Sequence, residues 1–284
     1  MILDFHTHTF PDAIAAAAVD KLQAASHTRP FSDGTVNGLR ASMTAAGIDA
    51  SVVLPVATST RQVPHINDSA IHVNARANET GVYSLGGMHP DFPDWEREME
   101  RLRAAGVRGV KLHPPYQGVD FDDERYIRIL KKASGLGMLV VTHAGLDVGL
   151  PGAEQSTPEK LLRAREKAPD TILILAHMGG WRCWDEVERL LPGAGIYLDT
   201  SFALGQMTSN GDGHYKTKQD LAMLEDEQFL RLISLFGADH ILFGTDSPWG
   251  DQSDSLQKIR ALPLPDADKS AVLGGNAEKL MRKG

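Results

Sequence analysis

Short runs of β-branched and aliphatic residues recur along the chain, each bounded by polar residues or by glycine and proline. Within a run the apolar positions are continuous rather than alternating, which indicates strands buried on both faces, as parallel sheets require. We expect one strand in each of eight runs: residues 2–8, 50–56, 82–89, 107–113, 137–143, 171–177, 195–201 and 240–246.

Segments with helical spacing lie between these runs; the clearest are residues 12–25, 65–80, 94–105, 123–135 and 158–168. Strand–helix alternation repeated eight times predicts an α/β fold, namely a (β/α)₈ TIM barrel. A doubly wound sheet is the alternative, because eight strands do not by themselves prove closure. Without a long linker, residues 1–284 are expected to form a single domain, completed by a C-terminal closing helix over residues 266–282.

Composition and charge narrow the range of partners. The net charge of -8 argues against nucleic acid, because binding phosphates requires a cationic surface. The single cysteine, Cys183, excludes an intramolecular disulfide and fits a reducing compartment. No stretch approaches the roughly 18 apolar residues of a membrane span, and the start lacks the features of a signal peptide. We therefore expect a cytoplasmic protein with no membrane partner, which could form a homo-oligomer.

Titratable side chains stand at the ends of five predicted strands. In a TIM barrel the C-terminal ends of all strands meet at one face, where active sites lie. Residues far apart in the sequence would therefore converge on one pocket. These residues are His6 and His8, Lys111 and His113, His143, His177, and Asp246.

The spacing of the two N-terminal histidines follows strand geometry. Side chains at positions i and i+2 share a face, so His6 and His8 are both expected to point inward. By the same rule Phe5 should face the helices. Asp4 should point inward one step deeper, where it would either orient a metal ligand or pair with a lysine such as Lys111.

Two imidazoles on one rigid strand suit a metal ion that prefers nitrogen ligands. His143 and Asp246 could supply a third nitrogen and a carboxylate, which would leave a position open for water, as in catalytic sites. Each residue alone has an ordinary alternative: His143 could be a buried core histidine, and Asp246 a helix cap or turn residue. The combination at three strand ends favours a metal site.

The motifs around these residues resemble the amidohydrolase superfamily, specifically its amidohydrolase-related (type 2) branch, which includes the aminocarboxymuconate-semialdehyde decarboxylase-like enzymes. The resemblance covers nearly the whole chain. It rests on DFHTH (4–8), GVKLHP (109–114), THAG (142–145), LAHMGG (175–180), ADHILFGTDSPWG (238–250) and GGNAEKL (274–280).

The resemblance implies one divalent metal ion bound by His6, His8, His143 and Asp246. Zinc is the first expectation, and manganese or iron(II) would accept the same ligands. The resemblance also implies that His177 polarises the substrate or moves a proton, and that Asp246 doubles as general base for a metal-activated water.

Lys111 raises an alternative, because some superfamily members bridge two metal ions with a carboxylated lysine at this strand. We expect one ion, and Lys111 would then either contact the substrate, together with His113 and Arg61, or be a buried ion-pair partner. Lys216 and Lys218 follow the seventh predicted strand and are either further substrate contacts or solvated loop charges. Cationic candidates near the site of an acidic protein indicate a small, anionic, carboxylate-bearing substrate.

The favoured function from sequence is a metal-dependent hydrolase that cleaves an amide, ester or lactone bond. The alternative is a metal-dependent non-oxidative decarboxylase of an unsaturated or aromatic acid, which would use the same site. A non-catalytic barrel that binds a ligand or partner is less favoured, because all the expected metal ligands are present.

Overall fold

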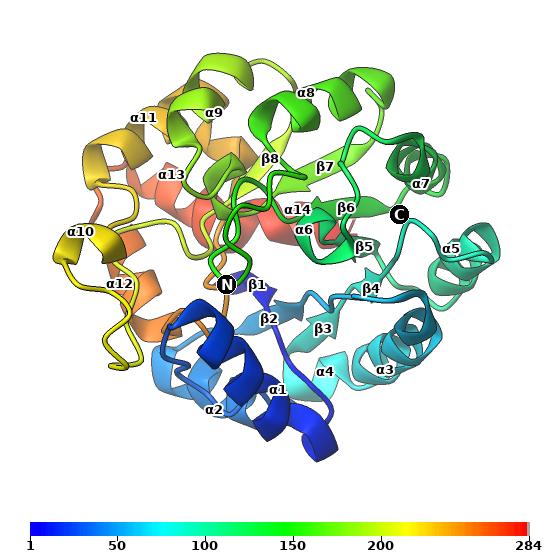
Figure 1. The fold of residues 1–284 in the computed structure, drawn as a ribbon, viewed down its shortest axis with the longest axis horizontal. Helices are drawn as coiled ribbons and strands as arrows, with labels where there is room; N and C mark the ends of the chain where they lie inside the picture. Colours follow the sequence, from blue (N-terminus) through cyan, green and yellow to red (C-terminus); the bar gives the residue numbers. More distant parts are fainter. Residues whose placement is uncertain (283–284) are drawn as a thin grey trace.

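The computed structural model describes residues 1–282, in which nine short parallel strands are surrounded by helices (Figure 1). The strand order is β1-β2-β3 in one sheet and β4-β5-β6-β7-β8-β9 in the other. The strands are β1 (Leu3–Thr7), β2 (Ala50–Val53), β3 (Val82–Ser84), β4 (Gly86–Gly87), β5 (Gly109–Leu112), β6 (Leu139–Thr142), β7 (Ile172–Leu175), β8 (Tyr197–Asp199) and β9 (Ile241–Leu242).

The helices form an outer layer around the strands. Among residues 1–282, no helix is both long and apolar enough to cross a membrane. The helices are α1 (Asp12–Ser26), α2 (Val36–Ala46), α3 (Val63–Ala75), α4 (Ala77–Thr80), α5 (Trp95–Ala104), α6 (Pro114–Gln117), α7 (Glu124–Gly135), α8 (Pro158–Lys167), α9 (Trp184–Leu190), α10 (Lys218–Leu221), α11 (Asp226–Phe236), α12 (Gln252–Ala261), α13 (Asp266–Ser270) and α14 (Asn276–Arg282).

Four of the five helices singled out from the sequence agree with α1, α5, α7 and α8 to within one residue at each end. The remaining one, expected over 65–80, is divided into α3 and α4 at Arg76.

Backbone hydrogen bonds join the first strand to the segment that follows the last one. The Phe5 amide donates to the Phe243 carbonyl (2.7 Å), and the Asp246 amide donates to the His6 carbonyl (2.8 Å). The two outer strands of the sheets, β1 and β9, are thereby brought together, so that the strands surround a common interior as predicted for a barrel.

The third predicted strand, 82–89, is divided into β3 and β4. β3 pairs with β2 and β4 pairs with β5, while Leu85 between them donates to the Val53 carbonyl (3.0 Å). A Cβ atom at Gly86 would lie 2.6 Å from a methyl carbon of Leu102, so α5 approaches this backbone more closely than a side chain would permit. The prediction of one continuous strand is therefore wrong in detail.

Two asparagines of α3 hydrogen-bond to the backbone at this division. The side chain of Asn74 accepts a hydrogen bond from the Ser84 amide (2.9 Å) and donates one to the Ser84 carbonyl (2.8 Å). Asn67 accepts from the Gly87 amide (2.8 Å) and donates to the Glu98 carboxylate (2.7 Å). Side-chain amides thus satisfy backbone groups that would otherwise be buried without a partner where the two sheets meet.

β1 contains one extra residue relative to β2. Asp4 lies opposite Ser51 but Thr7 lies opposite Val53, so three steps on β1 match two on β2. Such a bulge changes which side chains face inward. The prediction that Phe5 faces the helices is wrong: its ring is fully buried in an interior cluster with residues of β2, β6, β7 and β9.

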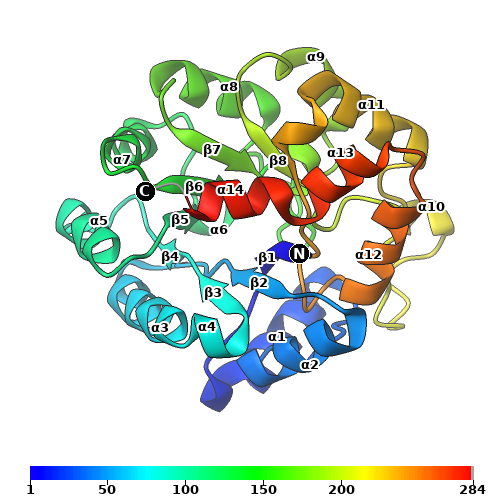
Figure 2. The same cartoon turned by 180° about the vertical axis from the view of Figure 1, so that it is seen from behind.

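The closing helix expected over 266–282 is divided into α13 and α14 by one π-helical turn. A Cβ atom at Gly274, within that turn, would lie 2.3 Å from the Met1 carbonyl oxygen, so the turn follows from close contact with the start of the chain. Figure 2 shows α14 crossing the end of the barrel opposite to the view of Figure 1, where Ala277 and Leu280 join the interior cluster.

We expect Asn67→Ala to lower the free energy of unfolding by about 2 kcal/mol, because it leaves the buried Gly87 amide without its acceptor and removes one of the two hydrogen bonds to Glu98 Oε1, of which Arg101 keeps the other. Urea unfolding followed by far-UV circular dichroism measures the change. Asn37→Ala, at an exposed position of α2, is the matched control and should change stability by less than about 0.5 kcal/mol. An Asn67→Ala variant as stable as this control would contradict the role assigned to the asparagine.

Candidate metal centre

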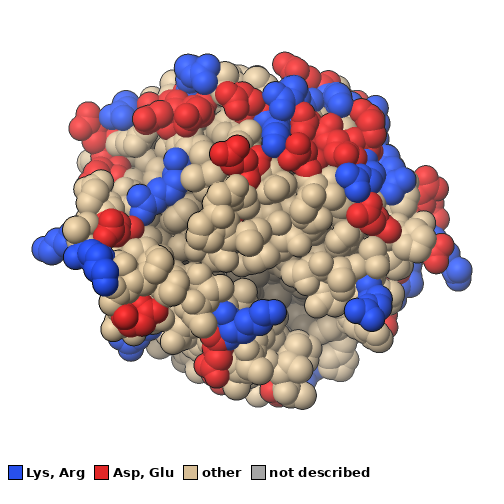
Figure 3. Space-filling view, viewed as in Figure 1, with Lys and Arg blue, Asp and Glu red and all other residues tan. Residues whose placement is uncertain are grey.

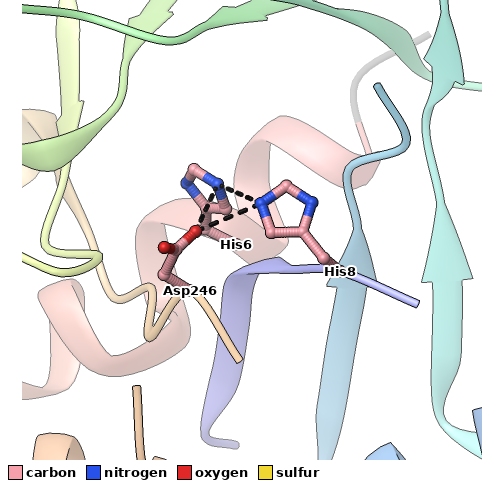
Figure 4. A group of neighbouring side chains, drawn as sticks. All are labelled: His6, His8 and Asp246. Atoms are coloured by element: carbon pink, nitrogen blue, oxygen red, sulfur yellow. Dashed lines mark hydrogen bonds and ion pairs between the residues drawn. The ribbon is translucent and has the colours of Figure 1, made fainter. Parts of the chain in front are cut away.

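Three predicted metal ligands come together at the C-terminal end of the barrel (Figure 4). The Nε2 atoms of His6 and His8 are 3.1 Å apart. Asp246 Oδ1 lies 3.2 Å from the first of these nitrogens and 3.1 Å from the second. Residues from β1 and from the segment after β9 therefore point three ligand atoms at one another.

The opposite ring nitrogens show which tautomer each histidine adopts. Nδ1 of His6 is 2.8 Å from a carboxylate oxygen of Asp199, and Nδ1 of His8 is 2.8 Å from the Leu54 carbonyl. Both partners only accept hydrogen bonds, so each Nδ1 carries the proton and each Nε2 has a free electron pair. Three electron-pair donors then face one another at about 3 Å, an arrangement that fits a bound cation.

The protonation states agree with this assignment. Burial, and next the charge of Lys111, hold the pKa of His6 well below its ordinary value, so its ring is neutral. Burial alone would raise the pKa of Asp246, but its contacts with His8 and His6 lower it below the usual range, so the carboxylate is ionised. Neutral imidazole and ionised carboxylate are the forms that bind metal.

The charges buried around the cluster also fit a divalent ion. The ammonium of Lys111 is almost fully buried, and burial lowers its pKa to about 8 against the opposing influence of Asp199, Asp246 and Asp147. Three carboxylates against one ammonium leave a formal charge of minus two, which one divalent cation would neutralise. Buried charge without compensation is costly, so the donor set and the charge both point to such an ion.

His143, the fourth predicted ligand, is not one of the three residues of this cluster and is linked to it through His177. Its Nε2 is 2.9 Å from the Leu146 carbonyl and therefore carries the proton, which leaves Nδ1 with a free electron pair. That Nδ1 is 3.2 Å from Nε2 of His177. Burial lowers the pKa of both rings, that of His177 to about 3. Coordination by His143 stays a prediction, with Nδ1 as the available atom.

His143 also belongs to a second group of close side chains, with His113 and Asp147. Asp147 Oδ2 is 3.6 Å from His113 Nε2 and 3.7 Å from His143 Nε2. The two imidazole rings stack, with centroids 4.5 Å apart and planes at 22°. Nearly parallel rings cannot both direct an in-plane electron pair at one ion, so this group fits a carboxylate beside two imidazoles better than a second metal site.

His177 reaches the pocket through an unusual backbone turn. Strand alternation would place it with Leu173 and Leu175, which pack on the helix-facing side. Instead His177 and Met178 adopt left-handed conformations, with φ of 59° and 53°, and turn the imidazole inward. Its Nδ1 lies 2.9 Å from the Ser201 carbonyl.

Asp4 contacts neither the imidazole of a predicted ligand nor a lysine among the described residues, and instead bonds the backbone beside the ligands. Its carboxylate accepts hydrogen bonds from the side chains of Gln252 (2.7 Å) and Thr245 (2.6 Å) and from the backbone amides of His6 and Thr245. Among the described residues it forms no ion pair with Lys111. Burial raises its pKa to about 7 despite these bonds. The bulge in β1 explains the error, because it reverses the face on which Asp4 lies.

The predicted substrate contacts differ in exposure. Lys111 and His113 are buried, and within residues 1–282 the Lys111 ammonium forms no hydrogen bond or ion pair. Arg61, Lys216 and Lys218 are exposed. On the face of the molecule seen in Figures 1 and 3, charged side chains lie mostly toward the edge. The middle of that face is largely uncharged and is hollowed (Figure 3).

Sequence reasoning missed Asp199 and Asp147. Asp199 ends β8 inside the predicted strand 195–201, so the rule that selected the other residues, a titratable side chain at the end of a strand, applies to it as well. Asp147 lies in the loop after β6, where the only signal was its spacing of four residues from His143.

We expect His6→Asn and Asp246→Asn to weaken Zn²⁺ or Mn²⁺ binding by more than about 100-fold, because each removes one donor of the cluster. His143→Asn should do the same if Nδ1 of His143 is the fourth ligand. Metal content by mass spectrometry and dissociation constants by chelator competition measure the effect. His65→Asn, at an exposed position of α3, is the control and should bind metal as the unmodified protein does. Full metal content in the His6 variant would rule out this centre.

Comparison with known proteins adds family and fold. A family model described as an amidohydrolase matches residues 3–283, and no curated protein matches the chain. An uncharacterised TIM-barrel protein from Bordetella bronchiseptica is 19% identical, with 99% of this chain and 98% of that one covered and a TM-score of 0.73. A 2,6-dihydroxybenzoate decarboxylase from Rhizobium is 16% identical (99% and 98% covered, TM-score 0.68).

A 5-carboxyvanillate decarboxylase from Novosphingobium aromaticivorans, complexed with manganese and 4-hydroxy-3-methoxy-5-nitrobenzoic acid, is 15% identical (99% and 96% covered, TM-score 0.69). At these identities the likeness shows a shared fold, and it confirms the predicted α/β barrel.

Proposed function

Because the chain belongs to the amidohydrolase family, we propose that it is a metal-dependent enzyme that decarboxylates a small aromatic or unsaturated acid without oxidation. The support is the barrel that it shares along nearly its whole length with decarboxylases of aromatic acids. This reverses the order of the two activities favoured from the sequence, where hydrolysis came first.

The proposed cofactor is one divalent ion held by Nε2 of His6 and His8, by Asp246 and by Nδ1 of His143. Manganese in a decarboxylase of the same fold supports Mn²⁺ beside Zn²⁺ as the ion. When bound, the ion would supply positive charge that holds substrate oxygens and makes a substrate hydroxyl or a water more acidic.

The protein's own groups fit the steps of decarboxylation. The reaction adds a proton to the carbon that carries the carboxylate and breaks the carbon–carbon bond; the electron pair of that bond stays with the substrate, and neutral carbon dioxide leaves. Asp246 is held ionised, so it can take a proton from a substrate hydroxyl and return it to that carbon. His177 directs its Nδ1 proton at Ser201 and can accept a hydrogen bond at Nε2.

Lys111 is the group best placed to receive the acid. Its side chain extends from β5 and is buried, and its ammonium has no hydrogen-bond or ion-pair partner among the described residues. A substrate carboxylate would supply that partner, and a charge-assisted hydrogen bond in a buried site is a strong one. The proposed substrate is therefore an anion small enough to enter the barrel mouth.

Hydrolysis is the second candidate. The family model is described as an amidohydrolase, and an ionised Asp246 beside an imidazole could also take a proton from an attacking water. The two reactions would use the same residues, so their products distinguish them.

We expect protein loaded with Mn²⁺ or Zn²⁺ to release carbon dioxide from at least one hydroxylated aromatic or unsaturated acid, in a panel that includes 2,6-dihydroxybenzoate and 5-carboxyvanillate. A parallel panel of esters, lactones and amides should show no turnover. Carbon dioxide capture and chromatography of products measure both. Asp246→Asn should lower the rate by about 10³-fold. Turnover confined to the hydrolysis panel would establish the second candidate instead.

Lys111→Met should raise KM for the acid by about 10- to 100-fold, because it removes the cationic partner of the carboxylate while keeping an unbranched side chain only one atom shorter. Arg61→Met should raise KM less, since Arg61 is exposed and solvent weakens its attraction. Steady-state kinetics measure both, and Lys216→Met serves as an exposed control. Unchanged KM in the Lys111 and Arg61 variants would exclude both residues as substrate contacts.

A further inference from the structure

We propose that Asp199 is a positioning residue that holds His6 and His177 in one fixed arrangement. It ends β8, its side chain is fully buried, and both of its oxygens are used in hydrogen bonds to these residues or to their neighbour Ser201. The proposal rests on the proposed role of His6 as a metal ligand, but not on which reaction the metal centre performs.

The two oxygens have separate tasks. Oδ2 accepts from Nδ1 of His6 (2.8 Å). Oδ1 accepts from the backbone amides of His177 and Ser201 (both 3.1 Å) and from the Ser201 hydroxyl (2.5 Å). Four donors thus converge on one carboxylate. Among the described residues, Asp199 and Ser201 are the two that hydrogen-bond to both His6 and His177.

The bond to Oδ2 decides which nitrogen of His6 is free. An acceptor at Nδ1 keeps the proton there and leaves Nε2 unprotonated toward His8 and Asp246. The Ser201 hydroxyl oxygen is 2.9 Å from the same Nδ1 and can accept there because its own proton is donated to Asp199. Without the carboxylate neither acceptor would be held in place, and the proton could move to Nε2, where it would occupy the electron pair that a metal needs. Carboxylates beside ligating histidines commonly have this effect on tautomer and affinity.

The bonds to Oδ1 hold the backbone turn after β7. His177 has a left-handed φ of 59°, a conformation that costs a non-glycine residue energy unless its surroundings stabilise it. The hydrogen bond from its amide to Asp199 stabilises that turn, and the turn points the imidazole inward. One carboxylate therefore sets the tautomer of a metal ligand on β1 and the position of a proton-transfer group after β7.

A side-chain amide cannot replace this carboxylate, so Asp199→Asn tests the proposal with almost no change in side-chain volume. If the introduced amide placed its oxygen toward His177 and Ser201, its NH₂ group would face the Nδ1 proton of His6. If the oxygen faced His6 instead, the NH₂ group would meet three donors. Either orientation sets a donor against a donor.

The experiment measures Zn²⁺ affinity by competition with a chromophoric chelator, without any substrate. Asp199→Asn should weaken Zn²⁺ binding by about 10- to 100-fold. Asn67→Ala is the control for lost stability: it disturbs a buried hydrogen-bond network at the β3–β4 division and should bind Zn²⁺ with the affinity of the unmodified protein. Equal affinity in the Asp199→Asn variant and the unmodified protein would overturn the proposal.

A second measurement needs no folded Asp199 variant. Long-range ¹H–¹⁵N spectra of the metal-free, unmodified protein report the tautomer of each histidine, and the His6 signals are those lost in His6→Asn. We expect the His6 proton on Nδ1, and a proton on Nε2 would refute the proposal. An inactive protein that shows this tautomer and binds Zn²⁺ would count against decarboxylation and hydrolysis while leaving the role of Asp199 intact.

Discussion

Hydrogen bonds join the first strand, β1, to the segment 243–247 that follows the last strand, β9, and the candidate site depends on them. The His8 amide donates to the Ser247 carbonyl (2.6 Å) and the Asp246 amide to the His6 carbonyl (2.8 Å). The buried carboxylate of Asp4 adds a hydrogen bond from the Thr245 hydroxyl. Because these bonds align both backbones, ligand atoms separated by most of the sequence lie about 3 Å apart without help from a flexible loop.

The bulge in β1 reconciles two demands on a single short strand. The lower part of the barrel must be filled by apolar side chains, which Leu3 and Phe5 provide within the interior cluster. The upper part must present imidazoles to the same interior, which His6 and His8 do. Regular alternation cannot place two consecutive residues, Phe5 and His6, on the same face, and the bulge between Asp4 and Thr7 makes this possible. Asp4, which precedes the bulge, then faces outward, and its carboxylate accepts hydrogen bonds from the backbone amides of His6 and Thr245.

Much of this arrangement follows from sequence periodicity, and the rest depends on backbone irregularities that periodicity does not encode. Apolar runs located the strands, and the rule that strand ends converge predicted that His6, His8 and Asp246 would meet, as they do. The rule fails for Asp4 because of the bulge, and alternation alone would turn His177 outward were it not for its left-handed turn. Asp199 also stands at the end of a strand, but the sequence did not single it out, because its hydrogen bonds to His6 and His177 are visible only in the structure.

The charges in the barrel also bear on which reaction the site favours. Three buried carboxylates and Lys111 would be neutralised by one divalent ion, so an anionic substrate adds an excess negative charge to a site with little water to screen it. Decarboxylation consumes a proton and converts that anion into uncharged carbon dioxide and a less charged product. Ester or lactone hydrolysis creates a new carboxylate and adds to the excess. On electrostatic grounds such a site would favour the reaction that discharges its substrate, with Lys111 as the proposed partner of the carboxylate.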